Sequence, residues 1–557
     1  MIMETTKINN RIRRLRNLKK LGCAAFLIFS FSQSLIFLTS CSDWDDHYDS
    51  LASQGASELT LWQTLQQHPE LSDFRDVLSK TKVFKYHKVT GVSYADLLDG
   101  AQTFTVLAPV NGSFNKDSVL SLLSTNRGDS MVVRSFVGNH LSYSQVANVN
   151  KPTDFFLINS KRATIGNNLA IDVPLQQNNI KAKGGILHVL QNTLPYRYNL
   201  YETLLNDSRY SKIGEQLSSY DEDEFSPTQS VEGGMVDGEQ IYVDSVFIER
   251  NLMMERIGEL ANEDSSYYAV FPNNDEWQRV WNEAMDHFRY DATVENGDSL
   301  QRYWANYALL SDAVFSRTIQ SSPEDSLKSY AYDKHYPKYH VFHKPFQPGG
   351  ILYGATPRQH SNGTLYSVDK WPFTPETTYL RELKSEGERT GLIVDYTQCS
   401  FTTRIHAADS VSENEYLVIT PRSTTTNWTM MFKLENTLAA NYDICAIVLP
   451  VTIYNPNAQL KPCKFQAEIS YVDENGVTQT FNCDNTKFTT DPTRVDTVML
   501  AENFRLPVCN YDQTNMKFTV KLKCSILARE SNQFSREMFL DCIYLRPRNE
   551  NQNNSEH

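Results

Sequence analysis

The sequence predicts a multidomain protein in which two copies of a mixed α+β domain precede an all-β sandwich. One segment predicts the copies: a short apolar strand turns at a proline and enters a helix at residues 105–114 (TVLAPVNGSF) and, in weaker form, at 268–277 (YAVFPNNDEW). The sandwich is predicted because the spacing of apolar residues changes from a helical period to alternation after about residue 379.

Each copy of this segment is followed by a second motif in the same order. Residues 184–195 (GGILHVLQNTLP) begin 79 residues after the first copy, and 362–372 (NGTLYSVDKWP) begin 94 residues after the second. Motifs that recur in one order indicate a duplicated domain, which we assign to residues 57–196 and 197–375. In the first copy, Pro109 predicts the turn, and Asn111 is expected to cap the free N–H groups of the helix that follows.

Both pairs of motifs resemble the two signature motifs of the fasciclin domain. The resemblance covers residues 57–375 and implies a compact fold with a β-wedge and flanking helices. Residues 133–141 (VRSFVGNHL) resemble the helix ending in His of that family. The resemblance implies that His140 and His188 hold strands and helices together by interior hydrogen bonds, with a ligand-binding or catalytic role as the alternative. Fasciclin domains generally serve adhesion and interaction.

The second copy carries two further features. Residues 221–234 (DEDEFSPTQSVEGG) form an acidic, turn-rich insertion without the alternating oxygen spacing of a calcium loop, so we expect a solvated surface loop. His335, His340 and His343 lie among tyrosines, and Pro337 argues against a helix that would align them. A metal site is one interpretation of these histidines. An exposed, tyrosine-rich loop that contacts a partner is the favoured one.

The first forty residues (1–40) predict an export signal. Seven basic residues precede residues 21–40, which contain no charge. Leu38, Thr39, Ser40 and Cys41 resemble the lipobox of bacterial lipoprotein precursors, which implies cleavage before Cys41 and a membrane anchor through a lipid on its thiol. The alternative is an uncleaved signal anchor, since about 20 apolar residues can cross a bilayer.

An acidic tether is predicted at residues 41–56. Ser42, Asp43, Asp45 and Asp46 resemble the export signal that sends lipoproteins to the outer face of the outer membrane in Gram-negative gut bacteria that forage on polysaccharides. The resemblance implies a lipid-anchored outer-membrane protein that faces the cell exterior. The alternative is an ordinary solvated tether.

The net charge excludes some classes of partner, and the positions of the cysteines predict their burial. The formal net charge of −13 argues against nucleic acid or an anionic lipid surface. Apart from Cys23 and Cys41, every cysteine lies after residue 398, several of them in apolar runs where cysteine behaves as a small buried hydrophobe. We therefore expect mostly buried thiols, and one or two disulfides are the alternative for some of them. No pair has zinc-site spacing, and we predict no metal and no cofactor.

Residues 376–548 predict the sandwich, because eight or more short alternating runs are separated by turns such as 473–476 (DENG). Residues 539–547 (FLDCIYLRP) resemble the last strand of jelly-roll carbohydrate-binding modules, which implies a jelly-roll-like sandwich and a glycan as a partner. Sugars bind aromatic faces together with amides or carboxylates, so the candidate glycan contacts are Asn427, Trp428, Tyr511 and Asp512. Ordinary loops of this composition are the alternative. Residues 549–557 predict a polar tail.

No nucleophile–base pair, phosphate loop or pair of catalytic carboxylates stands out, so we predict that the protein is not an enzyme. The leading hypothesis is a surface lipoprotein that acts as a binding subunit beside a TonB-dependent nutrient (glycan) importer and its lid lipoprotein. The second is an adhesin for host matrix or neighbouring cells. The third is a glycan-active enzyme or glycan-binding protein that works through the sandwich.

Overall fold

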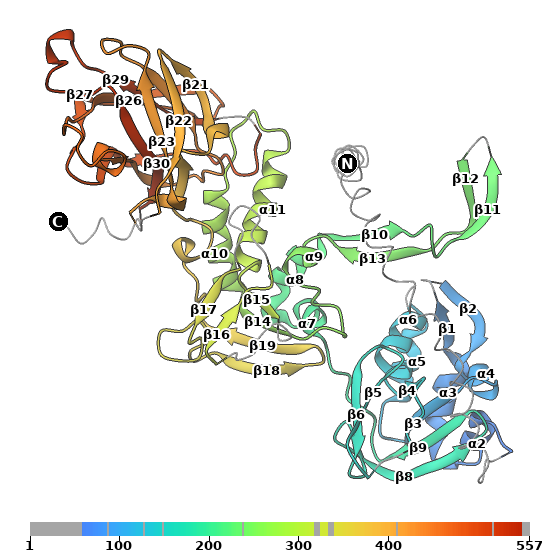
Figure 1. The fold of residues 1–557 in the computed structure, drawn as a ribbon. Coiled ribbons are helices and arrows are strands. Elements are labelled where there is room, and N and C mark those ends of the chain that lie inside the picture. Colours follow the sequence, from blue (N-terminus) through green and yellow to red (C-terminus); the bar gives the residue numbers. More distant parts are fainter. Residues whose placement is uncertain are drawn as a thin grey trace, which may run out of the picture. The chain divides into compact units, whose positions relative to one another are not determined.

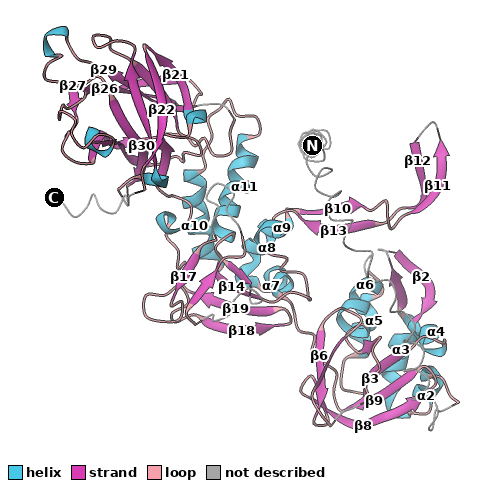
Figure 2. Ribbon diagram, in the orientation of Figure 1, coloured by secondary structure: helices cyan, strands magenta, loops and turns pink. Residues whose placement is uncertain are grey.

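The computed structural model describes residues 58–85, 88–125, 128–147, 150–236, 239–316, 324–331, 339–407, 410–514 and 517–548. The predicted leader with its lipid site at Cys41, the tether and the tail lie outside these residues. The protein is a mixed α+β protein in which most elements are strands (Figure 2). It divides into two compact units, Met1–Tyr196 and Arg197–His557. No helix within the described residues is both long and apolar enough to cross a membrane.

The first unit is built around one sheet whose strand order is β4-β3-β9-β8-β7-β6-β5 (Figure 1). Its strands are β3 (Phe104–Pro109), β4 (Leu141–Ser142), β5 (Thr153–Phe156), β6 (Arg162–Gly166), β7 (Leu169–Ala170), β8 (Val173–Ala182) and β9 (Gly185–Leu190), with β1 (Lys82–Lys85) and β2 (Lys88–Ser93) in a separate pair. Its helices are α2 (Leu61–Gln66), α3 (Ser72–Lys80), α4 (Tyr94–Asp99), α5 (Lys116–Leu122) and α6 (Gly128–Val132), followed by a π-helical turn (Val133–Val137).

The two motif strands of the first unit, β3 and β9, pair in parallel, and every residue of both is buried. Burial on both faces explains why both strands are continuous apolar runs instead of alternating ones. Phe104 lies opposite Gly185, where a Cβ atom would come within 1.9 Å of the Phe104 carbonyl oxygen. Only glycine allows this close approach of the two strands.

The sequence had led us to expect that Asn111 caps the helix that follows it. The structure shows that it does not. Its side-chain oxygen accepts a hydrogen bond from the backbone N–H of Asp73 (2.9 Å), in the first turn of α3, and its amide donates to the carbonyl of Pro69 (3.1 Å). The cap of the following helix, α5, is Asn115, whose side chain accepts from Ser118 N–H. The motif turn therefore ties β3 to the opening helices.

The second unit contains a sheet of order β15 (Val314–Ser316), β14 (Tyr267–Pro272), β19 (Gly363–Val368) and β18 (Thr356–His360), in which β14 and β19 are again parallel. Its glycine, Gly363, lies opposite Tyr267, with a Cβ position 2.2 Å from the Tyr267 carbonyl oxygen. The Asn274 side-chain oxygen accepts a hydrogen bond from the N–H of Lys212 in α8 (Ser211–Ser218). Asn111 accepts from Asp73 in α3 in the same way. The order β4-β3-β9-β8 of the first unit thus occurs a second time.

This part of the second unit contains the helices α7 (Leu200–Asn206), α8 (Ser211–Ser218), α9 (Met254–Ile257), α10 (Asn274–His287) and α11 (Gly297–Leu310). Its strands include β14 (Tyr267–Pro272), β15 (Val314–Ser316), β16 (Ser326–Lys328), β17 (Val341–His343), β18 (Thr356–His360) and β19 (Gly363–Val368).

The rest of the second unit consists of two facing sheets that share one apolar core (Figure 1). One sheet has the order β22-β23-β30-β25-β28, with β20 also paired to β30, and the other has the order β21-β24-β29-β26-β27. The strands are β20 (Leu383–Glu386), β21 (Ile393–Thr397), β22 (Cys399–Ile405), β23 (Glu415–Pro421), β24 (Thr429–Lys433), β25 (Asn441–Leu449), β26 (Lys464–Val472), β27 (Thr478–Thr489), β28 (Asp496–Arg505), β29 (Phe518–Cys524) and β30 (Met538–Pro547).

The end of α10 and the loop after it bind the sandwich directly. His287 Nδ1 lies 2.9 Å from the Ala439 carbonyl oxygen, Tyr290 donates its hydroxyl proton to the Tyr511 carbonyl (2.8 Å), and Asp291 forms an ion pair with Lys517. The apolar core runs through this contact without a break.

The cysteines of the sandwich confirm the expectation of mostly buried thiols. Cys399 is partly exposed, and the others are buried: Cys445, Cys463, Cys483, Cys509, Cys524 and Cys542. All seven are free thiols in the structure, so the alternative of one or two disulfides among them is not found.

Candidate functional site

The acidic insertion of the second unit is exposed at the surface, as expected, but it forms a two-stranded arm and not a loop. Its proximal ladder pairs β10 (Asp221–Phe225) with β13 (Phe247–Asn251), and its distal ladder pairs β11 (Val231–Val236) with β12 (Glu239–Asp244). Figure 1 shows the arm leaving the helices α8 and α9 and extending away from them. Within the described residues, no third strand joins either ladder.

The junction between the two ladders is fixed by hydrogen bonds. Ser226 N–H donates to the Val246 carbonyl (2.8 Å), and Val246 N–H donates to the hydroxyl of Ser230 (2.8 Å). Both serines lie in the turn-rich stretch of the insertion. Turn residues therefore connect strand pairs here and do not form an irregular loop.

The base of the arm is anchored in the unit. The Asn251 amide donates to the Leu217 carbonyl and to Asp221 Oδ1 (both 2.7 Å), and its oxygen accepts from Met254 N–H (2.8 Å). Tyr201 donates its hydroxyl proton to Asp221 Oδ2 (2.6 Å), and burial raises the pKa of this tyrosine. These bonds fix the direction in which the ladder leaves α8.

The two faces of the proximal ladder differ in their chemistry. On one face Arg250 forms ion pairs with Glu222, Glu224 and Glu255. On the other face Asp223 lies opposite Glu249, and Phe225 lies opposite Phe247. The Phe225 ring centroid is 5.7 Å from that of Phe247 and 4.9 Å from that of Tyr242. We call Asp223, Phe225, Tyr242, Phe247 and Glu249 the acid–aromatic face.

Large apolar side chains are exposed along the arm. The exposed fractions are 44% for Phe247, 43% for Ile248, 54% for Val231 and 68% for Met235. Single exposed apolar residues are ordinary on protein surfaces, but a series of them on a strand pair with open edges is typical of a contact surface. Sequence reasoning missed these residues. The adjacent apolar residues Phe247 and Ile248, shortly after a run of acids, were the signal that could have revealed them.

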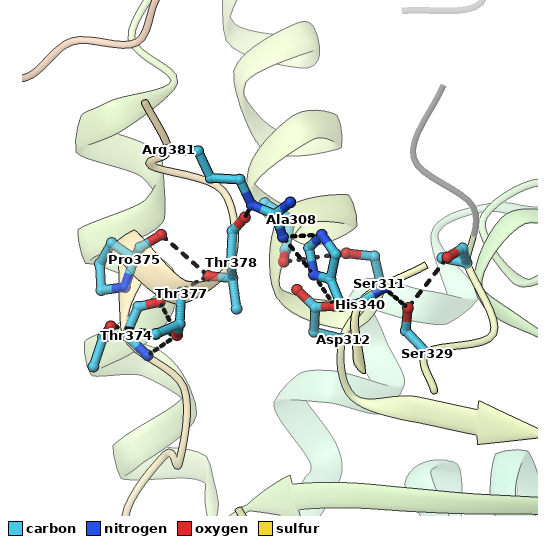
Figure 3. Close-up of polar contacts among 11 residues, drawn as sticks. Ala308, Ser311, Asp312, Ser329, His340, Thr374, Pro375, Thr377, Thr378 and Arg381 are labelled. Carbon is cyan, nitrogen blue, oxygen red and sulfur yellow. Dashed lines mark hydrogen bonds and ion pairs between the residues drawn. The ribbon is translucent and has the colours of Figure 1, made fainter. Parts of the chain in front are cut away.

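A second polar cluster joins the end of α11 to the segment that leads into β20. Figure 3 shows Arg381 between the Thr378 carbonyl and the ring of His340. His340 Nδ1 also lies 2.5 Å from Asp312 Oδ1, and the carboxylate of Asp312 is nearly fully buried. His340 N–H donates to the hydroxyl of Ser329 (3.0 Å).

This cluster borders a small cavity of about 40 Å³ whose lining includes Phe288, Trp304, Tyr379 and Tyr511. A cavity of this size holds one or two water molecules, not a sugar. Burial raises the pKa of Tyr379. The hydrogen bonds and the ion pair of this cluster therefore hold the segment before β20 against the end of α11.

The histidine-rich segment gives no support to a metal site. His340 contacts Asp312 and Arg381, His343 lies on an edge of the β16–β17 pair, and His335 lies outside the described residues. Among the residues that the structure describes, no group of three or more His, Cys, Asp or Glu side chains could hold a metal ion.

Two of the candidate glycan contacts lie in one loop of the sandwich and serve its packing. Trp428 is fully buried, and its Nε1–H donates to the Arg536 carbonyl (2.6 Å). Its ring has no face open to a sugar, so this expectation was wrong. The Asn427 amide donates to the Ile526 carbonyl (3.2 Å), and its oxygen accepts from Arg536 Nε (3.2 Å). Asn427 therefore holds two loops together.

The other two candidates lie on a different loop. The Tyr511 ring packs edge-on against Phe288 and Trp304, with centroid distances of 5.4 and 4.8 Å. Asp512 is exposed at a positive φ of 54°, and its N–H donates to Asn436 (3.0 Å). Tyr511 thus contributes to the contact with α10 and α11, whereas Asp512 and Asn427 are the two exposed residues of the four.

The sandwich also carries a polar cleft of about 190 Å³ at one end of β25 and β30. Charged side chains in its lining are Lys461, Asp491 and Glu537. The aromatic ring among its described lining residues, Phe539, is buried, so the cleft offers hydrogen bonds without a stacking platform.

A carboxyl cluster lies on the outer side of the sheet that contains β30. The Ser412 hydroxyl donates to Glu386 (2.8 Å), and the Ser412 N–H donates to Asp541 (3.0 Å). Burial raises the pKa of Asp541 to about 6 and that of Glu388 to about 7, and neighbouring carboxylates add to both shifts.

His140 and His188 are fully buried and hydrogen-bonded, which confirms their expected role of holding strands and helices together. His140 Nδ1–H donates to the Phe136 carbonyl (2.8 Å), and Nε2 accepts from Leu194 N–H (3.0 Å). His188 Nε2–H donates to the Val146 carbonyl (2.8 Å). Burial lowers the pKa of both rings, that of His140 to about 4, so both are neutral at pH 7.

No protein-family model matches the chain, and no curated protein matches its sequence. A solved FAS1 domain pair from the insect cell adhesion molecule Fasciclin I is 11% identical over 50% of this chain and 90% of its own, with a TM-score of 0.19. The CBM22-1 xylan-binding domain from Paenibacillus barcinonensis Xyn10C is 13% identical over 30% of this chain and 93% of its own, with a TM-score of 0.18.

The CBM22-1–GH10 modules of Clostridium thermocellum Xyn10B are 9% identical over 30% of this chain, with a TM-score of 0.20, and this chain spans 28% of their length. Scores of this size assign no family to the chain.

Proposed function

We propose that the protein is a non-enzymatic lipoprotein of the outer-membrane surface that acts as a binding subunit beside a TonB-dependent nutrient importer and its lid lipoprotein. The arm is the observation that carries this proposal. It is anchored at Asn251, no third strand of the described residues joins its ladders, and it exposes Phe247 and Met235. Such an element adds little to the core of its own unit and is suited to contact with another protein.

The place of the protein in the cell is proposed from the sequence. The lipobox-like residues 38–41 would attach the chain through a lipid on Cys41, and the acidic residues after it would direct the protein to the outer face of the outer membrane. A protein anchored there meets the extracellular side of importers as well as host and neighbouring cells. The arm suits either kind of partner, so adhesion is the second candidate function.

A glycan-binding role of the sandwich is the third candidate. The polar cleft with Lys461, Asp491 and Glu537 favours it, because these side chains can hydrogen-bond sugar hydroxyls. Affinity would rest on polar contacts alone, which predicts weak binding.

The test is a mild-detergent pull-down of the intact lipidated protein from its native outer membrane, with identification of the proteins that co-elute. Recovery of an importer and a lid protein at equal stoichiometry is the expected result. The matched control is the Cys41→Ser chain, which lacks the lipid and should lose these proteins if the anchor places the subunit beside them. Elution of the wild-type chain alone would contradict the importer role, and arrays of matrix proteins and glycans would then test the other two candidates.

A further inference from the structure

We propose that the carboxyl groups of Glu386, Glu388 and Asp541 form a proton-binding site that fastens β20 to β30, so that this strand pair holds in acid and loosens in alkali. The inference goes beyond the proposed function and does not depend on it. It concerns the place where the chain enters the sandwich, because β20 follows directly on the segment that Arg381 holds against α11.

The three carboxyls meet where two strands follow one another along the same edge of β30. β23 pairs with β30 on one side of Asp541, and β20 pairs with it on the other. Glu386 is the last residue of β20, and Glu388 follows shortly after it. Between them, the Gly387 N–H donates to the Asp541 carbonyl (2.8 Å). A change in the charge of these carboxyls therefore acts on the end of β20.

One serine joins two of the carboxyls. The Ser412 hydroxyl donates to Glu386 (2.8 Å), and its N–H donates to Asp541 (3.0 Å). Glu386 is 5% exposed and Asp541 is 2% exposed. The Lys384 ammonium group donates to the serine hydroxyl (3.0 Å), and within the described residues no lysine or arginine forms an ion pair with any of the three carboxyls. The site therefore buries acidic groups without a cation that pairs with them.

Two carboxyl oxygens of the site have no hydrogen-bond donor. Glu386 Oε2 and Glu388 Oε2 are shielded from solvent and have no partner among the described residues. Such an oxygen is very unfavourable on a charged carboxylate and much less so on a neutral carboxyl group. A metal ion is no alternative, since no group of three or more His, Cys, Asp or Glu side chains in the described part of the chain could hold one. A proton is the ligand that fits.

The charges around the site favour protonation as well. The other charged or titratable groups that act on the three carboxyls, from every element packed against them, are Lys384, Arg389, Glu413, Glu415 and Cys542. Both cations are exposed, so solvent screens them, whereas the two glutamates add negative charge. Burial raises the pKa of Glu386, raises that of Asp541 to about 6 and raises that of Glu388 to about 7.

The direction of the pH dependence follows from these shifts. A carboxyl group that solvent reaches has an ordinary pKa of about 4, so the closed strand pair binds more protons than an opened one between about pH 4 and pH 7. The stability that comes from these protons is complete in acid and is lost as the pH rises through the raised pKa values. At alkaline pH like charges face each other at the end of β20, and the strand should leave β30 more often.

Hydrogen exchange of the full chain, followed by mass spectrometry at about pH 5.5 and about pH 8, tests the proposal. The measured quantity is the protection factor of residues 383–388, from which the intrinsic effect of pH on exchange has been divided out. In the wild type it should fall by about tenfold or more between the two pH values. At about pH 8 it should also lie about tenfold or more below that of residues 464–472 in β26, because β20 then opens before the rest of the sandwich.

Substitutions identify the groups responsible. Glu388→Gln/Asp541→Asn removes two of the titrating carboxyls and keeps an oxygen that can accept from Ser412 N–H, so the fall should shrink to less than about threefold. Asp395→Asn/Glu435→Gln removes two exposed carboxylates of the same sandwich and should keep the tenfold fall. If the first double variant does not fold, Glu388→Gln alone leaves both hydrogen bonds of Ser412 in place, and its fall should be at least about threefold smaller than that of the wild type.

Three results would overturn the inference. The wild type could keep one protection factor at both pH values, or its fall could recur unchanged in the variants that lack Glu388. Equal protection of residues 383–388 and 464–472 at about pH 8 would mean that the sandwich opens as a whole and that β20 is not released by itself. The proposed function stands in each case, because it makes no use of this site.

Discussion

Replacement of His140 by Gln should remove the part of the first unit's acid sensitivity that comes from protonation of this buried ring. Burial lowers the pKa of His140 from an ordinary 6.5 to about 4 in the folded state. The unfolded chain therefore binds more protons than the folded chain between these values, so stability falls as the pH falls through this window. The difference of about 2.5 units corresponds to about 3 kcal/mol at about 1.4 kcal/mol per unit. Most of that loss, about 2 kcal/mol, falls between pH 7 and pH 4.5.

The geometry explains the cost of protonation. His140 Nε2 accepts from Leu194 N–H, and a proton on Nε2 would set two donors against each other in a site without solvent. Gln takes up no proton, so the variant should lack this part of the pH dependence. At pH 7 it should be less stable by about 1–3 kcal/mol, because Leu194 N–H or the Phe136 carbonyl loses its partner.

Hydrogen exchange of the full chain, followed by mass spectrometry, measures this effect at the amides of β3 and β9. The opening free energy of the wild type should fall by about 2 kcal/mol more than that of His140→Gln between pH 7 and pH 4.5. His68→Gln is the matched control, because His68 is partly exposed beside Glu70 in the same unit. The opening free energy of His68→Gln should fall by the same amount as that of the wild type, to within about 1 kcal/mol. Parallel pH curves for the wild type and His140→Gln would refute the reasoning.

Three further changes test other parts of the structure. Burial raises the pKa of Glu388 to about 7, so between about pH 4.5 and 7 the folded chain binds more protons than the unfolded chain, and its stability falls as the pH rises. In a thermal-shift assay, Glu388→Gln should therefore raise the unfolding temperature by roughly 2–4 °C at pH 8 and leave it unchanged at pH 4. Trp428→Phe should lower the denaturant-measured stability by about 1–2 kcal/mol, because the Arg536 carbonyl loses its donor, and glycan-array binding should stay as in the wild type. Gly363→Ala should give no folded protein, since the new Cβ would meet the Tyr267 carbonyl oxygen, whereas Gly391→Ala, at a position with open space, should match the wild type in soluble yield and circular dichroism.

The sequence predicted β3 and β9 well because their burial on both faces leaves a continuous apolar run. β3, β9, β14 and β19 all coincide with the four quoted motifs. The role of Asn111 could not be predicted, because its partner Asp73 comes from a helix far back in the chain. A local pattern shows that an amide is present, but not which free N–H group it satisfies.

The arm and the candidate glycan contacts escaped prediction for other reasons. Asp221–Phe225 (DEDEF) has low strand propensity, and its pairing with β13 is a tertiary effect that overrides local preference. Trp428 stands in a run of polar residues, yet the Arg536 carbonyl holds it inside the sandwich. The position of β30 within its sheet is a property of topology, which residue patterns along one strand do not encode.

The last strand of the chain, β30, lies in the interior of its sheet. One of its edges pairs with β25, and the other pairs with β20 and β23, so that Leu383 meets Leu545. Synthesis delivers the chain from its N-terminus, so β20 can pair with β30 only after the far end of the sandwich has been made. Closing so long a loop is slow, because its entropy is lost before the contacts form. A chain cut short before Met538 would keep its neighbouring strands unpaired and their apolar side chains in water. The core of the sandwich can therefore form only after residues 538–547 have been synthesised, so an incomplete chain cannot fold this domain.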